Sequence, residues 1–349
     1  MPGADHTART TLADVASRAG VSEMTVSRVV NDRPGVGSDT RERVRAAIAE
    51  LGYRPNIVAR GLKVERSRTI GLLVPDVTNP YFPEIVRGAE DVAIRRGYIL
   101  LLTNVIEDVE REIAAFEAFE DRRVEGVIAC SPRLDDERLD ALLRRHPAAV
   151  VVNRRTRPDA AGSVRIDHEH GARMLLRHLA AIGCRRLALL AGPSDSHAGR
   201  ERLLGFGHEA QERGVELAPA RIVHGPPTVE GGTRIARDLL ERDPSIDALV
   251  CFNDLVAAGA LQAAVEAGRL VPDDLVVTGY DDILFARMFT PALTTVHAPT
   301  YDLGRQAATM LFDRMQGRGR GVDIVLQPDL VLRASTARPP ATVPERTPR

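Results

Sequence analysis

Two patterns of apolar and polar residues divide the chain. From Thr11 to Leu51 apolar residues recur every three or four positions, which predicts helices and no strand. Thr11, Ser22 and Ser38 stand where side chains cap the starts of three successive helices. Gly20, between the first two helices, allows the positive φ that a short turn requires. The segment is therefore predicted to form a compact three-helix unit.

Short apolar runs replace this pattern after residue 68, with helical spacing between most of them. Such runs alternating with helices indicate parallel strands covered on both faces, and hence βαβ units. The predicted strands lie in Thr69–Pro75, Tyr98–Val105, Gly126–Cys130, Ala148–Val152, Leu187–Ala191, Ile246–Phe252 and Leu275–Gly279. They fall into two groups, before and after about Asp167, and each group suffices for a doubly wound sheet. We therefore expect two lobes with a ligand cleft at the carboxyl ends of the strands.

Composition narrows the class of protein. A chain of 349 residues with 44% hydrophobic and 27% charged residues is typical of a soluble protein of two or three units. No apolar run approaches the roughly 20 residues of a membrane helix, and the polar N-terminus lacks a secretory signal, so we expect a cytoplasmic protein. The three cysteines are widely spaced, which favours reduced thiols over a disulfide framework or a metal site.

Charge is distributed unevenly. Residues 1–66 hold 11 Lys and Arg against 8 Asp and Glu, so this segment has a net charge of +3 within a chain of net charge −1. A mildly basic head on an acidic body suits a nucleic-acid-binding module. On charge alone, an ordinary solvated surface remains the alternative.

Several motifs carry a more specific signal. Residues 11–31 read TLADVASRAGVSEMTVSRVVN and resemble the DNA-binding signature of the LacI/GalR family of bacterial repressors. The resemblance continues through TRERVRAAIAELGYRPN (40–56), IVARGL (57–62), IGLLVPDVTNPYF (70–82), GYDD (279–282) and FTPALTTV (289–296). It covers roughly residues 10–336 and implies a ligand-controlled transcription regulator.

The resemblance implies that the second helix lies in the major groove of DNA. There Arg28 would contact guanine, Glu23 would accept from cytosine N4, and Met24 would contact a thymine methyl group. Hydroxyl and amide side chains would bind phosphates and set the register. The complete implied set is Thr11, Leu12, Ser22, Glu23, Met24, Thr25, Ser27, Arg28, Asn31, Thr40, Asn56, Ala59 and Leu62. Gly37 departs from the family pattern, which commonly has a hydroxyl residue there; this leaves Ser38 to cap the third helix.

Residues 54–62 resemble the hinge of the family, which becomes helical on DNA. Leu62 would enter the minor groove, with Ala59 packed close by and Asn56 at the start of the segment. Insertion requires two chains side by side, so the resemblance implies a homodimer on a roughly palindromic double-stranded site. A plain linker with an incidental leucine remains the alternative.

The cleft residues follow from strand ends and from the resemblance together. Asp281 and Arg202 are the main candidates for binding ligand hydroxyls, with Arg200 as a competitor of Arg202. The implied effector set is Asn79, Tyr81, Phe82, Ser131, Asn153, Arg202, Asn253 and Asp281.

Purine-responsive relatives have Arg, Thr and a stacking Phe where this chain has Ser196, Ala198 and Pro227, so a purine is disfavoured. A sugar or sugar derivative is expected, although Arg154 and Arg155 leave an acidic or phosphorylated ligand open. Neither a cofactor nor a metal is expected.

The predicted fold class is an all-α helix-turn-helix head joined to an α/β two-lobed domain of the periplasmic-binding-protein kind, with two doubly wound parallel sheets. The expected parts are a disordered tail (1–10), the helix-turn-helix (11–55), a hinge (56–68), the effector and dimerisation domain (69–336) and a disordered tail (337–349). The first lobe is expected at about 69–165 and 297–320, and the second at about 166–296 and 321–336.

The sequence bears on three rival functions. A free solute-binding protein has no use for residues 11–62. The sequence shows no nucleophile elbow, Walker loop or paired-acid site, so an enzyme is not expected. A sensor that no longer binds DNA is the most serious competitor. The sequence therefore predicts a cytoplasmic, nucleoid-associated repressor, with the operator, the effector and the sign of its effect left open.

Overall fold

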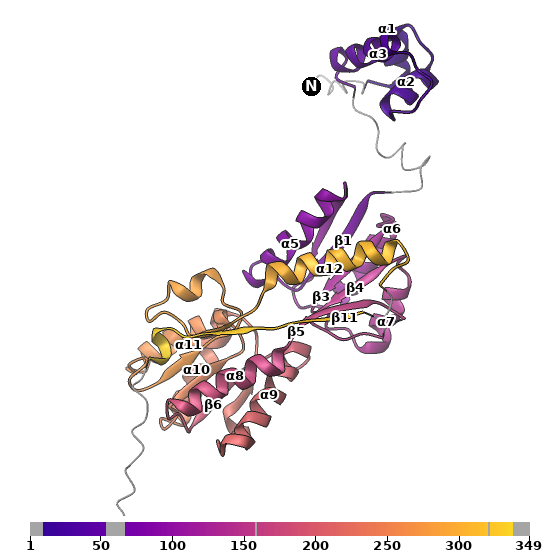
Figure 1. The fold of residues 1–349 in the computed structure, drawn as a ribbon. Helices are drawn as coiled ribbons and strands as arrows, with labels where there is room; N and C mark the ends of the chain where they lie inside the picture. The colour runs from indigo at the N-terminus through magenta and orange to yellow at the C-terminus, as the bar shows by residue number, and fades with distance from the viewer. Residues whose placement is uncertain (1–9, 54–66, 158, 320–321, 338–349) are drawn as a thin grey trace, which may run out of the picture. The chain divides into compact units, whose positions relative to one another are not determined.

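The computed structural model describes residues 10–53, 67–157, 159–319 and 322–337, and the chain divides after Ser67 into two compact units (Figure 1). The hinge residues Asn56, Ala59 and Leu62 lie outside the described residues, as do most of both predicted tails. None of the helices described is both long and apolar enough to cross a membrane.

The head consists of α1 (Leu12–Ala19), α2 (Glu23–Val30) and α3 (Ser38–Glu50). Thr11 and Asp14 form a complete capping box at α1, and Gly20 ends this helix with a φ of 65°. Ser22 caps α2 by accepting a hydrogen bond from the backbone N–H of Thr25. The head encloses a small core of its own, formed by Val15, Ala16, Ala19, Val26, Val29, Val44, Ala47 and Tyr53.

The expected cap of α3 is wrong. Gly37 occupies the N-cap position and makes no side-chain capping bond. Ser38 is the first residue of the helix, and its hydroxyl donates to the Asp39 carboxylate instead. The reason is local, because a side chain that caps a helix must stand before the first helical residue.

The first lobe is built on a parallel six-stranded sheet in the order β11-β5-β4-β3-β1-β2. These strands are β1 (Thr69–Val74), β2 (Ile99–Asn104), β3 (Gly126–Cys130), β4 (Ala149–Val152), β5 (Gly162–Ile166) and β11 (Asp323–Leu326). One core joins the sheet to α5 (Tyr81–Arg95) and α12 (Thr300–Met315), and another joins it to α6 (Val109–Asp121) and α7 (Asp136–Arg144).

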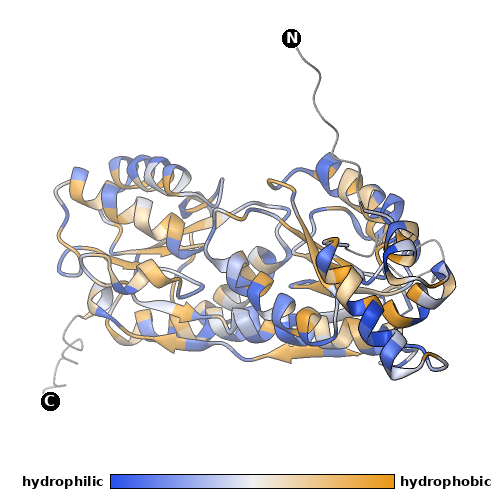
Figure 2. Ribbon diagram, turned by 90° about the horizontal axis from the view of Figure 1, so that it is seen from above, coloured by the Kyte–Doolittle hydropathy of each residue, from blue (hydrophilic) through white to orange (hydrophobic). Residues whose placement is uncertain are grey.

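The second lobe contains a parallel four-stranded sheet in the order β7-β6-β8-β9. Its strands are β6 (Leu187–Gly192), β7 (Ile222–His224), β8 (Ala248–Cys251) and β9 (Val276–Thr278). One face packs against α10 (Val229–Arg242) and α11 (Asp254–Glu266), and the other against α8 (His168–Ala181) and α9 (His197–Arg213). Short 3₁₀ helices lie at Pro219–Arg221, Leu284–Arg287 and Ala334–Thr336. The strands of both lobes are the most hydrophobic layers of this unit (Figure 2).

The chain passes between the lobes after β5, after β10 (Thr295–His297) and again between β11 and β12 (Asp329–Val331), which pairs antiparallel with β10. The last crossing lies later than the expected boundary near residue 321, because β11 pairs with β5 and so extends the sheet of the first lobe. Periodicity missed β5 because Arg165 interrupts its apolar residues, and it missed β11 because only three apolar residues follow Asp323 at the start of that strand.

Candidate functional site

Helix α2 of the head has one buried and one exposed side. Val26 and Val29 pack into the core of the head. Glu23, Met24 and Arg28 are exposed, and 67% of the Met24 surface is open to solvent. An apolar side chain this exposed gains nothing from the core, so all three expected base-reading residues are available to a partner.

The other described residues of the expected DNA-binding set are engaged in contacts to different degrees. The Thr11 hydroxyl donates to Asp14, and the Ser22 and Thr25 hydroxyls lie 3.0 Å apart. Asn31 donates from its amide to the Ser27 carbonyl at 2.7 Å. Leu12 and Thr40 are half-buried. These contacts hold several of the polar side chains in defined orientations.

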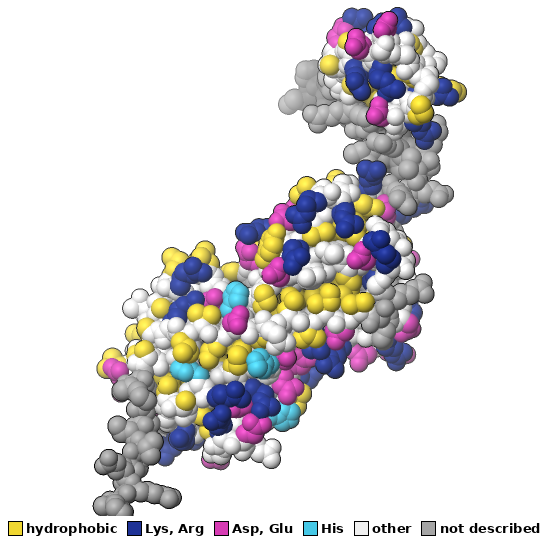
Figure 3. Space-filling model, viewed as in Figure 1, with side chains coloured by type: hydrophobic (Ala, Val, Ile, Leu, Met, Phe, Trp, Pro, Cys, Tyr) yellow, Lys and Arg dark blue, Asp and Glu magenta, His cyan; other side chains and the backbone are white. Residues whose placement is uncertain are grey.

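Two ion pairs in the head leave other cations unpaired. Arg18 contacts Glu50 at 2.7 Å, which links α1 to α3, and Arg41 contacts Asp32 at 2.7 Å. Within the described residues, Arg28 has no acidic partner. Basic and acidic side chains are interspersed on the face of the head shown in Figure 3. The unpaired cations are the ones that a polyanion can contact without breaking an existing ion pair.

In the two-lobed unit, unusual backbone conformations gather where strands end. Glu107 after β2, Ser131 after β3, Asn153 after β4 and Asp281 after β9 have φ values of 56°, 47°, 59° and 105°. Non-glycine residues adopt positive φ rarely, and such strain concentrates at functional sites. The strand ends therefore form the candidate ligand site of this unit.

The structure brings all eight expected effector residues together around one inner pocket of about 40 Å³. Glu107, Arg133 and Phe252 also line this pocket and were not expected there. Phe252 directly precedes Asn253 and could have been found from the strand end. Arg133 and Glu107, in contrast, reach the pocket from loops that the sequence pattern does not place.

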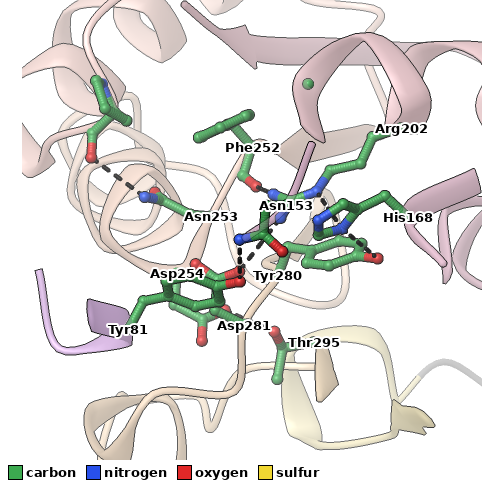
Figure 4. Close-up of polar contacts among 12 residues, drawn as sticks. Tyr81, Asn153, His168, Arg202, Phe252, Asn253, Asp254, Tyr280, Asp281 and Thr295 are labelled. Carbon is green, nitrogen blue, oxygen red and sulfur yellow. Dashed lines mark hydrogen bonds and ion pairs between the residues drawn. The ribbon is translucent and has the colours of Figure 1, made fainter. Parts of the chain in front are cut away.

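Arg202 is the central cation of the inner pocket. Its Nη2 donates to Oδ1 of Asp281 at 3.3 Å, its Nη1 donates to the carbonyl of Phe252, and its Nε donates to Nδ1 of His168 at 3.4 Å. Its guanidinium carbon lies 3.6 Å from the centroid of the Tyr280 ring. These contacts fix the guanidinium in one orientation (Figure 4).

The competing arginine, Arg200, is exposed and donates to the carbonyl of Ser194 at 3.2 Å. It does not line the inner pocket, whereas Arg202 does. Arg202 is therefore the arginine that a ligand in this pocket meets.

Two buried carboxyl groups stand on the second-lobe side of the pocket. Burial raises the pKa of Asp281 to about 7, although the nearby Arg202 guanidinium acts in the opposite direction. Burial also raises the pKa of Asp254 well above its ordinary value, and the neighbouring Asp281 adds to this effect. Asp254 accepts from the Thr295 hydroxyl at 2.6 Å and from the backbone N–H of Ile283 at 2.8 Å. Asp254 thus ties α11 to β10, while Asp281 faces the pocket.

Amide side chains contribute from both lobes (Figure 4). Asn153 donates to the Tyr81 hydroxyl at 2.7 Å and to the Ser131 hydroxyl at 3.2 Å. Its Oδ1 is buried without a hydrogen-bond partner among the described residues. Asn253 caps α11 by accepting from Val256 N–H at 2.8 Å, and its amide donates to the Pro227 carbonyl at 3.2 Å. A buried acceptor without a donor is costly, so Asn153 is suited to receive a ligand hydroxyl.

The inner pocket adjoins a wider outer compartment of about 630 Å³. Asn79, Phe82, Glu107 and Pro227 line both spaces. This volume is within the roughly 300–1,000 Å³ of ordinary ligand pockets, whereas the inner pocket holds little more than a few water molecules. Together the two compartments form the cleft.

Arg154 and Arg155, which the sequence analysis linked to an acidic or phosphorylated ligand, do not line the cleft. Arg154 is 2% exposed and donates to the carbonyls of Pro132 and Leu134 and to the Asp136 carboxylate. Arg155 is exposed. The observed contacts give Arg154 a structural role beside the loop that follows β3.

Comparison with known proteins yields two family matches and many relatives. Residues 11–56 match the family model of bacterial regulatory proteins, lacI family, and residues 176–336 match that of a periplasmic binding protein-like domain. The chain is 37% identical over 329 residues to the HTH-type transcriptional regulator RegA of Clostridium saccharobutylicum, covering 94% of this chain and 99% of RegA. It is 36% identical over 307 residues to the ribose operon repressor of Halalkalibacterium halodurans, covering 88% of this chain and 91% of that repressor. Its structure resembles the lac repressor dimer bound to operator and the anti-inducer ONPF, with a TM-score of 0.86, 32% identity and coverage of 94% and 99% of the two chains.

Proposed function

This chain belongs to the lacI family of bacterial regulatory proteins, and we propose that it is a repressor that binds an operator and responds to a small molecule in its cleft. The observation that carries this proposal is the exposed side of α2, where Glu23, Met24 and Arg28 stand free of the core. Membership of a family of regulators agrees with the expectation that the chain is not an enzyme.

We propose that α2 reads the major groove. Arg28 would contact guanine in bidentate fashion, Glu23 would accept from cytosine, and Met24 would contact a thymine methyl group. Thr11, Leu12, Ser22, Thr25, Ser27, Asn31 and Thr40 would position the head on the backbone. The proposed hinge, with Asn56, Ala59 and Leu62, would bend the operator from the minor groove.

The operator complex would contain two copies of the chain. Exposed apolar side chains occur in both lobes, at Ile94 and Ile99 of the first and at Leu284 and Met288 of the second, each at least 61% exposed. Strand β2, which contains Ile99, is also an edge strand of its sheet. Apolar surface and an uncovered edge are both features that association with a second copy would bury. The two heads would then address two half-sites of a palindrome.

In the proposed effector site, Asp281, Arg202, Asn153 and Asn253 bind hydroxyl groups of a sugar or sugar derivative. Ligand binding would change the closure of the lobes about the crossings after β5, β10 and β11. A coupling free energy of about 1–3 kcal/mol between cleft and head is sufficient for regulation. The proposed place of action is the bacterial cytoplasm, at the nucleoid.

The test is selection of binding sites from random double-stranded DNA with the full-length protein at fixed salt, repeated with a pool of metabolites. The expected product is a palindrome, and Arg28→Ala should alter the selected bases. Asp281→Ala should retain the same palindrome but lose any response to the pool. Failure of the wild-type protein to enrich a sequence, both with and without metabolites, would contradict the proposal and favour a sensor that does not bind DNA.

A further inference from the structure

We infer that the outer compartment of the cleft is a second ligand subsite, which accepts an uncharged or positively charged ring and rejects phosphate and carboxylate groups. This inference rests on the proposed function, because it assigns a chemical class to the ligand of the same cleft.

The charged side chains that line the outer compartment are all acidic. Asp76, Glu107, Asp195 and Glu230 contribute carboxylates, and none of its described lining residues is Lys, Arg or His. A cleft lined by charges of one sign concentrates counter-ions and excludes ions of the same sign. A phosphate or carboxylate group entering this space therefore meets repulsion from several directions.

Among the described residues, one of the four carboxylates forms an ion pair and a second accepts hydrogen bonds. Glu107 forms an ion pair with Arg133 at 2.6 Å, and Asp76 accepts two hydrogen bonds from Thr78. Asp195, before α9, and Glu230, in the first turn of α10, are exposed and contact no basic side chain among the described residues. Arg200 bonds to the carbonyl beside Asp195 but does not line the compartment. Among the described residues, no ion pair therefore weakens the negative electrostatic potential of Asp195 and Glu230.

The remaining walls are apolar and suit a ring. Phe82, Ile106, Pro193, Pro226 and Val229 line the outer compartment. Apolar and aromatic side chains of this kind pack against the C–H face of a ring without requiring hydrogen bonds. The compartment therefore combines apolar contact with negative charge.

The small volume of the inner pocket is the reason why we expect the ligand to extend into the outer compartment. It provides directional polar groups, including the buried, unpartnered Oδ1 of Asn153 and the Arg202–Asp281 pair. Its volume of about 40 Å³ is far below the roughly 300–1,000 Å³ of ordinary ligand pockets, whereas the adjoining compartment offers about 630 Å³. A ligand whose hydroxyls reach Asp281 thus extends into the acidic compartment, and a compound of two rings fills both.

The charge of the compartment can be measured without knowing the ligand. Ile106 lines it and is 55% exposed, while Cys130, Cys184 and Cys251 are all buried, so the Ile106→Cys variant carries one accessible thiol among the described residues. The probes are two methanethiosulfonate reagents, one bearing a trimethylammonium group and the other a sulfonate. The ratio of their rates is compared with the ratio for free 2-mercaptoethanol.

We expect the cationic reagent to be favoured about tenfold over the free-thiol ratio, at the lower end of what charged clefts achieve. Asp195→Asn with Glu230→Gln should remove at least about two thirds of this preference. The matched control, Asp238→Asn with Glu241→Gln on the exposed side of α10, removes the same charge outside the lining and should leave the preference intact. A preference below about threefold, or one that survives the Asp195 and Glu230 substitutions, would overturn the inference.

The ligand class is tested by thermal denaturation of the full chain with neutral disaccharides and nucleosides, their monosaccharide parts and their phosphorylated counterparts. At least one neutral two-ring compound should raise the midpoint of thermal denaturation, and its phosphorylated counterpart should not raise it. Equal shifts with a phosphorylated counterpart or a single ring would contradict the inference. If no compound of any class shifts the midpoint, the effector part of the proposed function fails, while the thiol ratio separately decides the charge selection.

Discussion

The raised pKa of Asp281 predicts how the stability of the protein depends on pH. Asp281 is 7% exposed, and burial raises its pKa from an ordinary value of 3.8 to about 7 even with Arg202 at 3.3 Å. A carboxyl group with a higher pKa in the folded chain binds more protons when folded. Its contribution to the free energy of unfolding therefore falls as the pH rises between these two pKa values.

Replacing Asp281 by Asn removes this titration and keeps the shape of the side chain. From pH 5 to pH 8 the two pKa values imply that the variant gains about 2.5 kcal/mol in free energy of unfolding relative to the wild type. The attraction of Arg202 for the ionised carboxylate is already contained in the folded pKa of about 7, so the exchange of the neutral carboxyl for an amide adds only an offset that does not vary with pH. The informative quantity is therefore the slope against pH and not the difference at one pH.

The assay is urea unfolding of the full chain followed by circular dichroism at several pH values. Asp273→Asn, at an exposed carboxylate of the same lobe, serves as the control and should show no comparable gain. If the difference between Asp281→Asn and wild type stays constant within about 0.5 kcal/mol from pH 5 to pH 8, the burial argument for this carboxyl is refuted.

Three further predictions concern packing, DNA and the head. An added Cβ at Gly304 would lie 1.9 Å from a backbone oxygen of α5, so Gly304→Ala should lower the free energy of unfolding by about 2–4 kcal/mol in chemical denaturation. Gly207 has open space around it, so Gly207→Ala should raise the free energy of unfolding by about 0.5–1 kcal/mol. Equal effects of the two substitutions would contradict the packing argument. In fluorescence anisotropy at fixed salt, Arg28→Ala should weaken binding to the selected operator by about 1–3 kcal/mol and relax the preference at one base position. The control Arg45→Ala on α3 should keep the base preference. Loss of the preference in both variants would point to a non-specific charge effect. Thr11→Ala removes one half of a capping box and should destabilise the head by about 1 kcal/mol in thermal unfolding, and an unchanged midpoint would show that the box contributes nothing measurable.

Much of the head was predictable because its signals are local. The capping box of Thr11 and Asp14, the cap at Ser22 and the turn at Gly20 each involve residues within a few positions of one another. The error at Ser38 is also local, since the helix begins one residue earlier than a cap at that position requires. The boundary depends on backbone geometry that hydroxyl chemistry alone does not specify.

The cleft residues were predictable as a set for a different reason. Polar residues at the carboxyl ends of parallel strands meet at one edge of a sheet, and the family resemblance added Arg202 from α9. The pattern of short apolar runs also located most of the strands. It did not reveal β11, whose alternation is weak and whose partner β5 lies more than 150 residues earlier in the chain.

Local sequence patterns predicted the three helices of the head, most of the buried strands and the polar residues that meet at the cleft, because these properties depend on neighbours along the chain. Three properties depend on the tertiary structure: which arginine faces the pocket, how the pKa of Asp281 rises to about 7, and how four carboxylates come to line the outer compartment. Arg202 meets Asp281 across 79 positions, and Asn153 meets Tyr81 across 72. Burial and the approach of distant charges set these properties, and both arise only when the lobes have folded.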